Sequence, residues 1–167
     1  MGKVILCGPS ASGKDYARKK FETKGFKLGV SFTTRDPRPG EVNGEDYLFI
    51  TKEDFEGMIE QDMWLEYDRV DNKLEDGTVI SDYYGTTKEQ FELFDLFIMT
   101  PSGISKIPKE YHDQFVVIGF DIDEDIRIKR MKSGRGWEDG KIDTRLSWEK
   151  KEFADYYADI KVKNEDF

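Results

Sequence analysis

The stretch that most constrains the fold of this chain is VILCGPSASGKDY, at residues 4–16. Its first residues form an apolar run typical of a short buried strand, which leads directly into a loop that contains Gly8 and Gly13. A helical pattern follows and closes at Gly25. A strand that passes through a glycine loop into a helix predicts the first unit of an α/β fold, with the loop at the carboxyl edge of a parallel sheet.

The loop follows the pattern G-x-x-x-x-G-K-[ST] from Gly8 to Lys14, but Asp15 stands where a hydroxyl normally holds magnesium. Glycines let backbone N–H groups turn inward on an anion, the helix end adds positive potential, and Lys14 supplies a mobile charge for the outer phosphates. An ordinary glycine-rich turn is the structural alternative. The apolar strand before the loop and the helix after it favour phosphate binding.

The rest of the chain alternates segments with strand and helix patterns, which predicts an α/β sandwich around a parallel sheet flanked by helices. We expect strands at residues 4–7, 27–32, 47–50, 64–70, 94–100 and 115–122. We expect helices at residues 13–25, from Thr51 onward, at 124–132 and at 144–157, with a hairpin turn at Asp76–Gly77.

Composition narrows the class of protein further. A length of 167 residues suits one domain, and no run of 18 apolar residues predicts a membrane span. The apolar run before Gly8 is too short for a signal peptide, and the single Cys7 fits a reducing compartment, so we expect a cytoplasmic protein. The net charge of −9 argues against nucleic-acid binding, and the only histidine, His112, lies in a polar connection without a catalytic role.

The most specific segment is SFTTRDPRPGEVNGEDYLF, at residues 31–49. Arg35 and Arg38 lie three positions apart in a loop that prolines stiffen, where two guanidinium groups can grip a phosphate monoester bidentately. A solvated turn with scattered charges is the alternative. It does not explain why two arginines, nearby tyrosines and a separate phosphate loop occur in one small chain.

This segment resembles the GMP-binding motif of the guanylate kinase family, S-x-T-T-R-x-P-R-x-G-E-x-x-G-x-D-Y-x-F. The resemblance continues in the family's order through Glu66 in WLEY, Tyr83–Thr87, Arg130–Gly136, Arg145 in DTRL and Asn164 in VKNEDF. It implies an enzyme that phosphorylates GMP or dGMP from ATP with Mg²⁺, giving GDP or dGDP. It also implies a P-loop core at 1–30, 88–128 and 146–167, an NMP-binding subdomain at 31–87 and a lid at 129–145.

The resemblance assigns a role to each matching position of this sequence. It places ATP at Gly8, Ser10, Ala11, Ser12, Gly13, Lys14, Asp15 and Asn164. Asp15 is also the expected metal residue, because of the chemistry of its carboxylate. The residues that neutralise the transferring phosphoryl group are Lys14, Arg130, Arg135 and Arg145. The resemblance assigns the binding of the acceptor phosphate to Arg35, Arg38, Tyr47 and Tyr84. It assigns the binding of the base to Ser31, Glu66, Thr86 and Thr100. Arg127 and Lys129 are interpreted as a solvated helix face.

The chemistry of guanine supports the role of Glu66 independently. Guanine presents adjacent N1–H and N2–H donors, which one carboxylate accepts together, whereas adenine has an acceptor at N1 and would leave buried groups unpaired. A surface position on an amphipathic strand is the alternative for Glu66. The acceptor phosphate itself has a second pKa of about 6, so its oxygen is ionised at neutral pH and needs no general base.

Three features depart from the family pattern. Asp15 adds a carboxylate, a hard ligand for Mg²⁺, which other P-loop kinases with a GKD loop also carry. Ile98 and Thr100 replace two aspartates, one of which helps to bind guanine in the family, and Asp15 is hypothesised to compensate for the lost charge. The stretch between Glu66 and Tyr84 is longer than usual, and the family's last helix is not expected, which suggests an abbreviated kinase of viral origin.

Two other functions remain open at this point. One is a P-loop kinase for another phosphorylated acceptor, such as a different deoxynucleoside monophosphate or ribose 1,5-bisphosphate. The other is a non-catalytic guanylate-kinase-like module that binds phosphopeptides, although the retained Lys14, Arg130 and Arg135 argue against it. We expect small-molecule nucleotides as partners, neither nucleic acid nor membrane, and a monomer or homodimer; a viral protein would act in the host cytoplasm.

Overall fold

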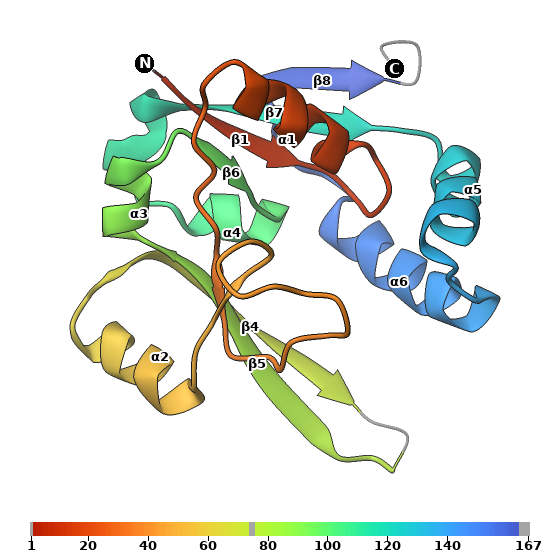
Figure 1. Cartoon of the computed structure of the whole chain (residues 1–167), viewed down its shortest axis with the longest axis horizontal. Coiled ribbons are helices and arrows are strands. Elements are labelled where there is room, and N and C mark those ends of the chain that lie inside the picture. The colour runs from red at the N-terminus through yellow and green to blue at the C-terminus, as the bar shows by residue number, and fades with distance from the viewer. Residues whose placement is uncertain (1, 74–75, 164–167) are drawn as a thin grey trace.

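The computed structural model describes residues 2–73 and 76–163 of the chain (Figure 1). Its elements in chain order are β1 (Lys3–Cys7), α1 (Lys14–Thr23), β2 (Phe32–Thr33), β3 (Leu48–Phe49), α2 (Lys52–Glu60), β4 (Trp64–Lys73), β5 (Val79–Thr87), α3 (Lys88–Leu93), β6 (Leu96–Ile98), α4 (Pro101–Lys106), the 3₁₀ helix η1 (Lys109–Gln114), β7 (Phe115–Asp121), α5 (Glu124–Arg135), α6 (Asp139–Glu152) and β8 (Ile160–Lys163). Among the described residues, no helix has the length and apolar character needed to cross a membrane.

The core is a parallel sheet with the strand order β6-β1-β7-β8. Alternate residues of β1 enter two hydrophobic clusters on opposite faces: Ile5 packs with Phe97 and Val117, and Leu6 packs with Phe120. Helix α1 contributes to the second cluster, whereas α3 and α4 contribute to the first. The sheet is therefore covered on both faces, as the apolar runs at its central strands predict.

The carboxyl ends of the parallel strands position the site. Strand β1 leads into the glycine loop and α1, and the neighbouring strand β7 leads into α5 at the same end of the sheet (Figure 1). Helix α6 lies beside α5 at that end. Residues far apart in the sequence therefore meet around the glycine loop.

A second sheet with the order β3-β2-β5-β4 is built from residues between α1 and α3. Its main unit is the long antiparallel hairpin of β4 and β5, in which Glu66 pairs with Thr86. Gly77 has a φ of 86° at the end of the hairpin, where the Thr78 N–H donates to the Asp76 carboxylate over 2.8 Å. The predicted turn at Asp76–Gly77 is confirmed.

The prediction of a strand at residues 27–32 is wrong for most of its length. Leu28 makes only an isolated bridge to Leu96 of the core sheet, whereas Phe32 pairs with Gly85 of the second sheet. The segment thus crosses from one sheet to the other. Gly29 permits the crossing because a Cβ there would collide with the ring of Phe97.

The helices near the C-terminal end of the chain also differ from their predicted bounds. Helix α5 continues past the predicted end at residue 132 to Arg135, and Gly136, whose φ of 61° is left-handed, caps it. Helix α6 begins at Asp139 rather than Thr144 and ends at Glu152. After it, the ring of Tyr156 packs on Phe153 with centroids 5.5 Å apart, and the chain enters β8. The capped start of α2 at Thr51 is confirmed, since its side chain accepts from the Asp54 N–H.

The close contact at Gly29 yields a stability prediction. Gly29→Ala is expected to lower the free energy of unfolding by about 1–3 kcal/mol, because the new methyl group must displace the buried ring of Phe97. Gly57→Ala is the matched control, since Gly57 lies in α2 with nothing within 4 Å of an added methyl group, and alanine there should stabilise by about 0.5–1 kcal/mol. Urea unfolding measures both, and equal effects of the two substitutions would contradict the packing.

Candidate active site

The loop between β1 and α1 has the backbone geometry of an anion site. Gly13 has a φ of 98° and Ala11 a φ of 59°, so the chain turns tightly before α1 begins. At Gly8 a Cβ would lie 2.8 Å from Cβ of Phe120 and 2.9 Å from Oγ of Ser12. No side chain fits at Gly8, which explains in physical terms why the loop begins with glycine.

Lys14 lies inside this loop rather than in solvent. Its Nζ donates to the backbone oxygens of Gly8 over 2.5 Å and of Pro9 over 2.7 Å. Burial lowers the pKa of Lys14 from 10.5 to about 8, although the nearby Asp15 carboxylate opposes the shift. The structure thus holds the ammonium group at the centre of the loop by two carbonyl groups, which a phosphate oxygen can replace.

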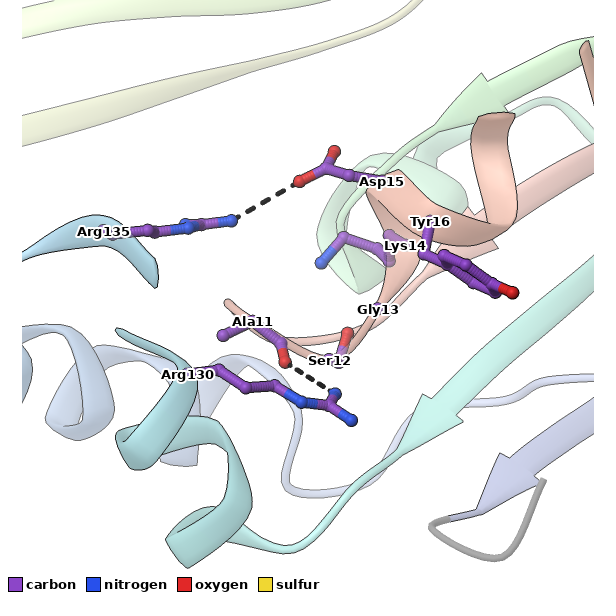
Figure 2. A pocket seen from close by; sticks show the side chains of 8 residues that line it. All are labelled: Ala11, Ser12, Gly13, Lys14, Asp15, Tyr16, Arg130 and Arg135. Carbon is purple, nitrogen blue, oxygen red and sulfur yellow. Dashed lines mark hydrogen bonds and ion pairs between the residues drawn. The ribbon is translucent and has the colours of Figure 1, made fainter. Parts of the chain in front are cut away.

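A pocket of about 600 Å³ opens in front of the loop (Figure 2). It is lined by Ala11, Ser12, Gly13, Lys14, Asp15, Tyr16, Arg130 and Arg135. Two arginines of α5, Arg130 and Arg135, therefore face the loop across the pocket. The buried hydroxyl of Ser12 has no hydrogen-bond partner among the described residues, so this pocket contains an unused donor.

Asp15 stands in the first turn of α1, at the edge of the pocket. Its side chain is 69% exposed, and its Oδ2 lies 3.5 Å from Nη2 of Arg135 (Figure 2). On the other side of the pocket, Nη1 of Arg130 donates to the backbone oxygen of Ala11 over 3.1 Å. The carboxylate of Asp15 is held by one long ion pair, which leaves it accessible.

Arg145 does not line this pocket but binds the loop at Ser10. Its Nε donates to Oγ of Ser10 over 2.9 Å and to Oε1 of Glu149 over 2.8 Å. Glu149 also accepts from Arg127, which is buried; the interpretation of Arg127 as part of a solvated face is wrong. The reason is that α5 turns this side chain toward α6, where a carboxylate balances its charge.

Glu149 is a residue that the sequence reasoning missed. Its carboxylate accepts hydrogen bonds from Ser10, Arg127 and Arg145. Burial alone would favour the protonated form, but these donors hold the pKa of Glu149 below its ordinary value. The only local signal was the spacing of four between Arg145 and Glu149 on one helix, which is common on solvated helices too.

The arginine loop at residues 31–49 is ordered by an internal ion pair. Both Nη groups of Arg35 donate to the Glu41 carboxylate over 2.9 Å, and this hydrogen bonding raises the pKa of Arg35. The backbone N–H of Arg38 donates to the same carboxylate over 2.7 Å. Nε of Arg35 is buried and has no hydrogen-bond partner in the described part of the chain. Glu41 was also missed, although it lies within the segment that the resemblance matches.

The two tyrosines assigned to the acceptor phosphate lie together beside Arg35. The ring centroids of Tyr47 and Tyr84 are 5.9 Å apart, and the guanidinium carbon of Arg35 lies 5.3 Å from the centroid of Tyr47. Burial raises the pKa of Tyr47, so its hydroxyl stays a donor at neutral pH. The structure therefore brings three of the four predicted phosphate residues into one cluster, and Arg38 lies exposed near it on the same loop.

Glu66 is buried, contrary to the alternative of a surface position. It is 8% exposed, and burial raises its pKa from 4.5 to about 7. Thr86 pairs with it across the hairpin, and a Cβ on Gly103 would lie 3.1 Å from its Oε2 and 3.5 Å from Oγ1 of Thr100. Three of the residues predicted for the base thus meet at one place. The fourth, Ser31, precedes Phe32, which pairs with Gly85 next to Thr86.

Both positions that lack the family's aspartates serve local structure. Thr100 caps α4, since its Oγ1 accepts the N–H of Gly103 over 3.1 Å. Ile98 packs in the hydrophobic cluster on one face of the parallel sheet. A nearby acid, Asp68, is itself bound by Ser102 and Lys106 of α4. The buried carboxylate next to Gly103 and Thr100 is therefore that of Glu66.

Two further residues discussed from the sequence are Asn164 and His112. Asn164 lies outside the described residues. Nε2 of His112 lies 2.9 Å from the backbone oxygen of Ile107, and its ring packs on Phe115. In residues 2–73 and 76–163 no group of three histidine, cysteine, aspartate or glutamate side chains is arranged to hold a metal ion.

A parallel sheet whose first strand passes through a glycine loop into a helix, with arginines facing that loop, defines the class of P-loop nucleotide-binding proteins. Within that class the chain belongs to the guanylate kinase family, because the family model described as guanylate kinase matches residues 1–167. The resemblance of the arginine loop to this family is confirmed.

Curated relatives are called guanylate kinase in three organisms. That of Aster yellows witches'-broom phytoplasma (strain AYWB) is 44% identical over 94 residues, that of Onion yellows phytoplasma (strain OY-M) 43% over 94, and that of Blochmanniella floridana 42% over 93. These matches cover 53–54% of this chain and 40% of each relative. The chain therefore spans less than half of the curated relatives that it matches.

A solved structure supports the fold. The crystal structure of guanylate kinase from Anaplasma phagocytophilum superposes with a TM-score of 0.69 at 23% identity, covering 99% of this chain and 77% of that one. The predicted α/β class with a parallel sheet flanked by helices is confirmed.

The burial of Glu66 yields a prediction for stability against pH. The folded pKa of about 7 lies above the ordinary 4.5, so the folded chain binds a proton that the unfolded chain has lost between those pH values. Glu66 therefore destabilises the fold above pH 7, and this cost disappears as the pH falls. Glu66→Gln should raise the free energy of unfolding by roughly 2 kcal/mol at pH 8 and by much less at pH 5.

Urea unfolding of both proteins at the two pH values measures this difference. Other ionisable groups are common to both proteins and cancel in the comparison. A stability difference that is the same at pH 5 and pH 8 would contradict the raised pKa.

Proposed function

We propose that this chain transfers the γ-phosphoryl group of ATP to GMP or dGMP by direct in-line transfer, giving GDP or dGDP. The observation that carries the proposal is the presence of two anion-binding clusters in a guanylate kinase family chain. One is the glycine loop with Lys14, faced by arginines of α5, and the other is the cluster of Arg35 with two tyrosines. The names of the curated relatives support the same reaction.

ATP is proposed to bind with its phosphates at the glycine loop. The residues involved are Gly8, Ser10, Ala11, Ser12, Gly13, Lys14 and Asp15, with Asn164 expected on the adenine side. The accessible space in front of the loop and the unpartnered hydroxyl of Ser12 support this placement. Lys14, Arg130, Arg135 and Arg145 neutralise charge on the transferring group.

The acceptor is proposed to bind between the arginine loop and the hairpin. Its phosphate is held by Arg35, Arg38, Tyr47 and Tyr84, and its guanine by Ser31, Glu66, Thr86 and Thr100. The unpartnered Nε of Arg35 is one donor for that phosphate. The ionised carboxylate of Glu66 accepts N1–H and N2–H of guanine, so GMP binding removes the cost of an unpaired buried charge.

The residues present fit a magnesium ion that arrives with the nucleotide. Mg²⁺ is commonly bound by one or two carboxylates together with substrate phosphates and water, and Asp15 offers one exposed carboxylate at the pocket edge. When bound there, the ion would neutralise charge on the phosphates of ATP. Asp15 is the side chain that would hold it, in competition with its ion pair to Arg135.

The rest of the reaction needs positioning and charge neutralisation. An acceptor phosphate oxygen is already ionised at neutral pH, since its second pKa is about 6, so none of the described side chains has to remove a proton. We further propose that the subdomain at 31–87 and the lid at 129–145 close over the substrates and exclude water. The chain is expected to act on free nucleotides in the cytoplasm, as a monomer or homodimer.

The decisive experiment is a turnover assay with a panel of phosphorylated acceptors. Purified protein with ATP and Mg²⁺ is mixed with GMP, dGMP, AMP, dCMP, dTMP or ribose 1,5-bisphosphate, and products are separated by ion-exchange chromatography. GMP or dGMP should be phosphorylated with the highest kcat/KM. Preference for another acceptor would overturn the guanine assignment, and no turnover with any acceptor would leave a non-catalytic binding module.

Glu66→Gln gives the panel its specificity control. It should raise the KM for GMP by about tenfold or more while the KM for ATP stays within about twofold, because the amide puts a donor against the donors of guanine. Glu56→Gln is the matched control, since Glu56 contacts the hydroxyl of Tyr83 on an exposed side of the same subdomain. It should leave both constants unchanged.

The role of Asp15 yields a prediction for metal dependence. Asp15→Asn is expected to raise the Mg²⁺ concentration for half-maximal activity by about tenfold, because an amide oxygen is a weaker ligand for a hard cation than a carboxylate. Asp15→Ser, which restores the usual residue of the motif, should lie between the two. Glu22→Gln is the control on the same helix, since Glu22 pairs only with Arg18 at 3.8 Å. Unchanged metal dependence in both Asp15 variants would remove Asp15 from the metal site.

A further inference from the structure

Behind the glycine loop, a buried carboxylate connects three parts of the chain. Glu149 of α6 is 2% exposed, and its Oε1 accepts the backbone N–H of Ser10 over 2.7 Å and Nε of Arg145 over 2.8 Å. Its Oε2 accepts from Nη1 of Arg127, in α5, over 2.8 Å. One side chain therefore links the loop to both helices that follow β7.

Ser10 is the loop residue on which these contacts converge. Its N–H donates to Glu149, its backbone oxygen accepts from Nη1 of Arg127 over 3.2 Å, and its hydroxyl accepts from Nε of Arg145 over 2.9 Å. Each polar group of Ser10 is thus bound by a side chain of α5 or α6. Side chains of α5 and α6 therefore fix Ser10, directly before the loop residues that line the pocket.

The three charged side chains differ in their freedom to move. Arg127 and Glu149 form a buried ion pair with side-chain exposures of 8% and 2%, whereas the side chain of Arg145 is 44% exposed. Arg127 and Glu149 cancel one another's charge, so Arg145 keeps its positive charge for another anion. In the described part of the chain it donates hydrogen bonds only through Nε, and its guanidinium carbon lies 4.7 Å from the ring centroid of Trp148.

We propose that Glu149 is a positioning residue for phosphoryl transfer: it anchors Arg145 through Nε against the glycine loop and leaves both Nη groups to bind phosphate oxygens. This inference rests on the proposed function. Arginine suits the arrangement because its donors are fixed in one plane, so an anchored Nε orients the Nη pair. Arg127 makes the arrangement stable, since it balances the charge of Glu149 without using Arg145.

The test separates this role from that of a buried ion pair that only stabilises the fold. Glu149→Gln alone leaves Arg127 buried without a counter-ion, and that protein can fail to fold. The double variant Arg127→Met/Glu149→Gln removes both buried charges. The neutral amide oxygen at the position of Oε1 still accepts the Ser10 N–H, but it binds Nε of Arg145 more weakly than the carboxylate does. Thermal unfolding establishes that this variant is folded, and kcat and the KM for ATP are then measured with GMP.

A double-mutant cycle with Arg145→Ala decides whether Glu149 acts through Arg145. Arg145→Ala is expected to lower kcat by about 100-fold, and the Arg127→Met/Glu149→Gln variant by about tenfold or more. The triple variant should be no worse than Arg145→Ala within about threefold, since the anchor has no effect without the arginine. The proposal would be overturned if the fall in kcat of the triple variant equals the product of the falls in Arg145→Ala and in Arg127→Met/Glu149→Gln. It would also be overturned if Arg127→Met/Glu149→Gln keeps the kcat of the parent protein.

The matched control is the ion pair of Glu124 and Lys150, which joins the same two helices over 3.6 Å without touching the loop. The double variant Glu124→Gln/Lys150→Met should keep the kcat of the parent protein. A loss equal to that of the Arg127→Met/Glu149→Gln variant would show that any weakening of the α5–α6 contact is sufficient, and would overturn the proposal.

A second readout does not depend on turnover. The Nε–H of Arg145 should give a protected signal in a ¹H–¹⁵N spectrum, assigned by its loss in Arg145→Ala, and this signal should weaken in the Arg127→Met/Glu149→Gln variant. A signal that is unchanged in that variant would show that Glu149 does not anchor Nε of Arg145, and would overturn the proposal. Parent protein that turns over no acceptor overturns the proposed function as well, whereas active parent protein with multiplying losses overturns only the role of Glu149.

Discussion

The parallel pairing of β1 with β6 and β7 is the constraint on which the rest of the structure depends. It aligns Val4 with Leu96 and Val116 and brings the carboxyl ends of three strands to one edge. The glycine loop follows the first strand, the capped turn at Thr100 the second, and α5 the third. Because parallel strands share a direction, every connection that leaves this edge contributes to one site.

Two buried glutamates differ in the number of hydrogen-bond donors around the carboxylate and in the direction of their pKa shifts. Glu149 is surrounded by donors from Ser10, Arg127 and Arg145, so it stays ionised and holds the loop in place. Glu66 has no comparable set of donors among the described residues, and burial raises its pKa. The first carboxylate is satisfied within the chain and supports structure. The second is buried at a cost to stability.

The departures from the family pattern have local physical explanations. Thr100 stands where the family has an aspartate, and its hydroxyl caps α4. Ile98 stands at the other aspartate position and packs in the sheet core. Asp15 puts a carboxylate at the other end of the site, where Arg135 faces it at 3.5 Å. Relative to the family pattern, negative charge is therefore lost beside Glu66 and gained beside the glycine loop. The same ion pair gives Arg135 a partner within the chain.

The sequence by itself determined the fold class, the glycine loop, the capped start of α2 and the hairpin turn, because each depends on local patterns of apolar residues, glycine and capping side chains. Through the family resemblance it also named side chains that the structure brings together, such as Arg35, Tyr47 and Tyr84. Only the tertiary structure decided that Arg127 is buried, that Glu149 anchors Arg145 and that residues 27–31 cross between sheets. These depend on contacts between residues far apart in the chain, and a charge on a helix has the same local pattern whether it faces water or a buried partner.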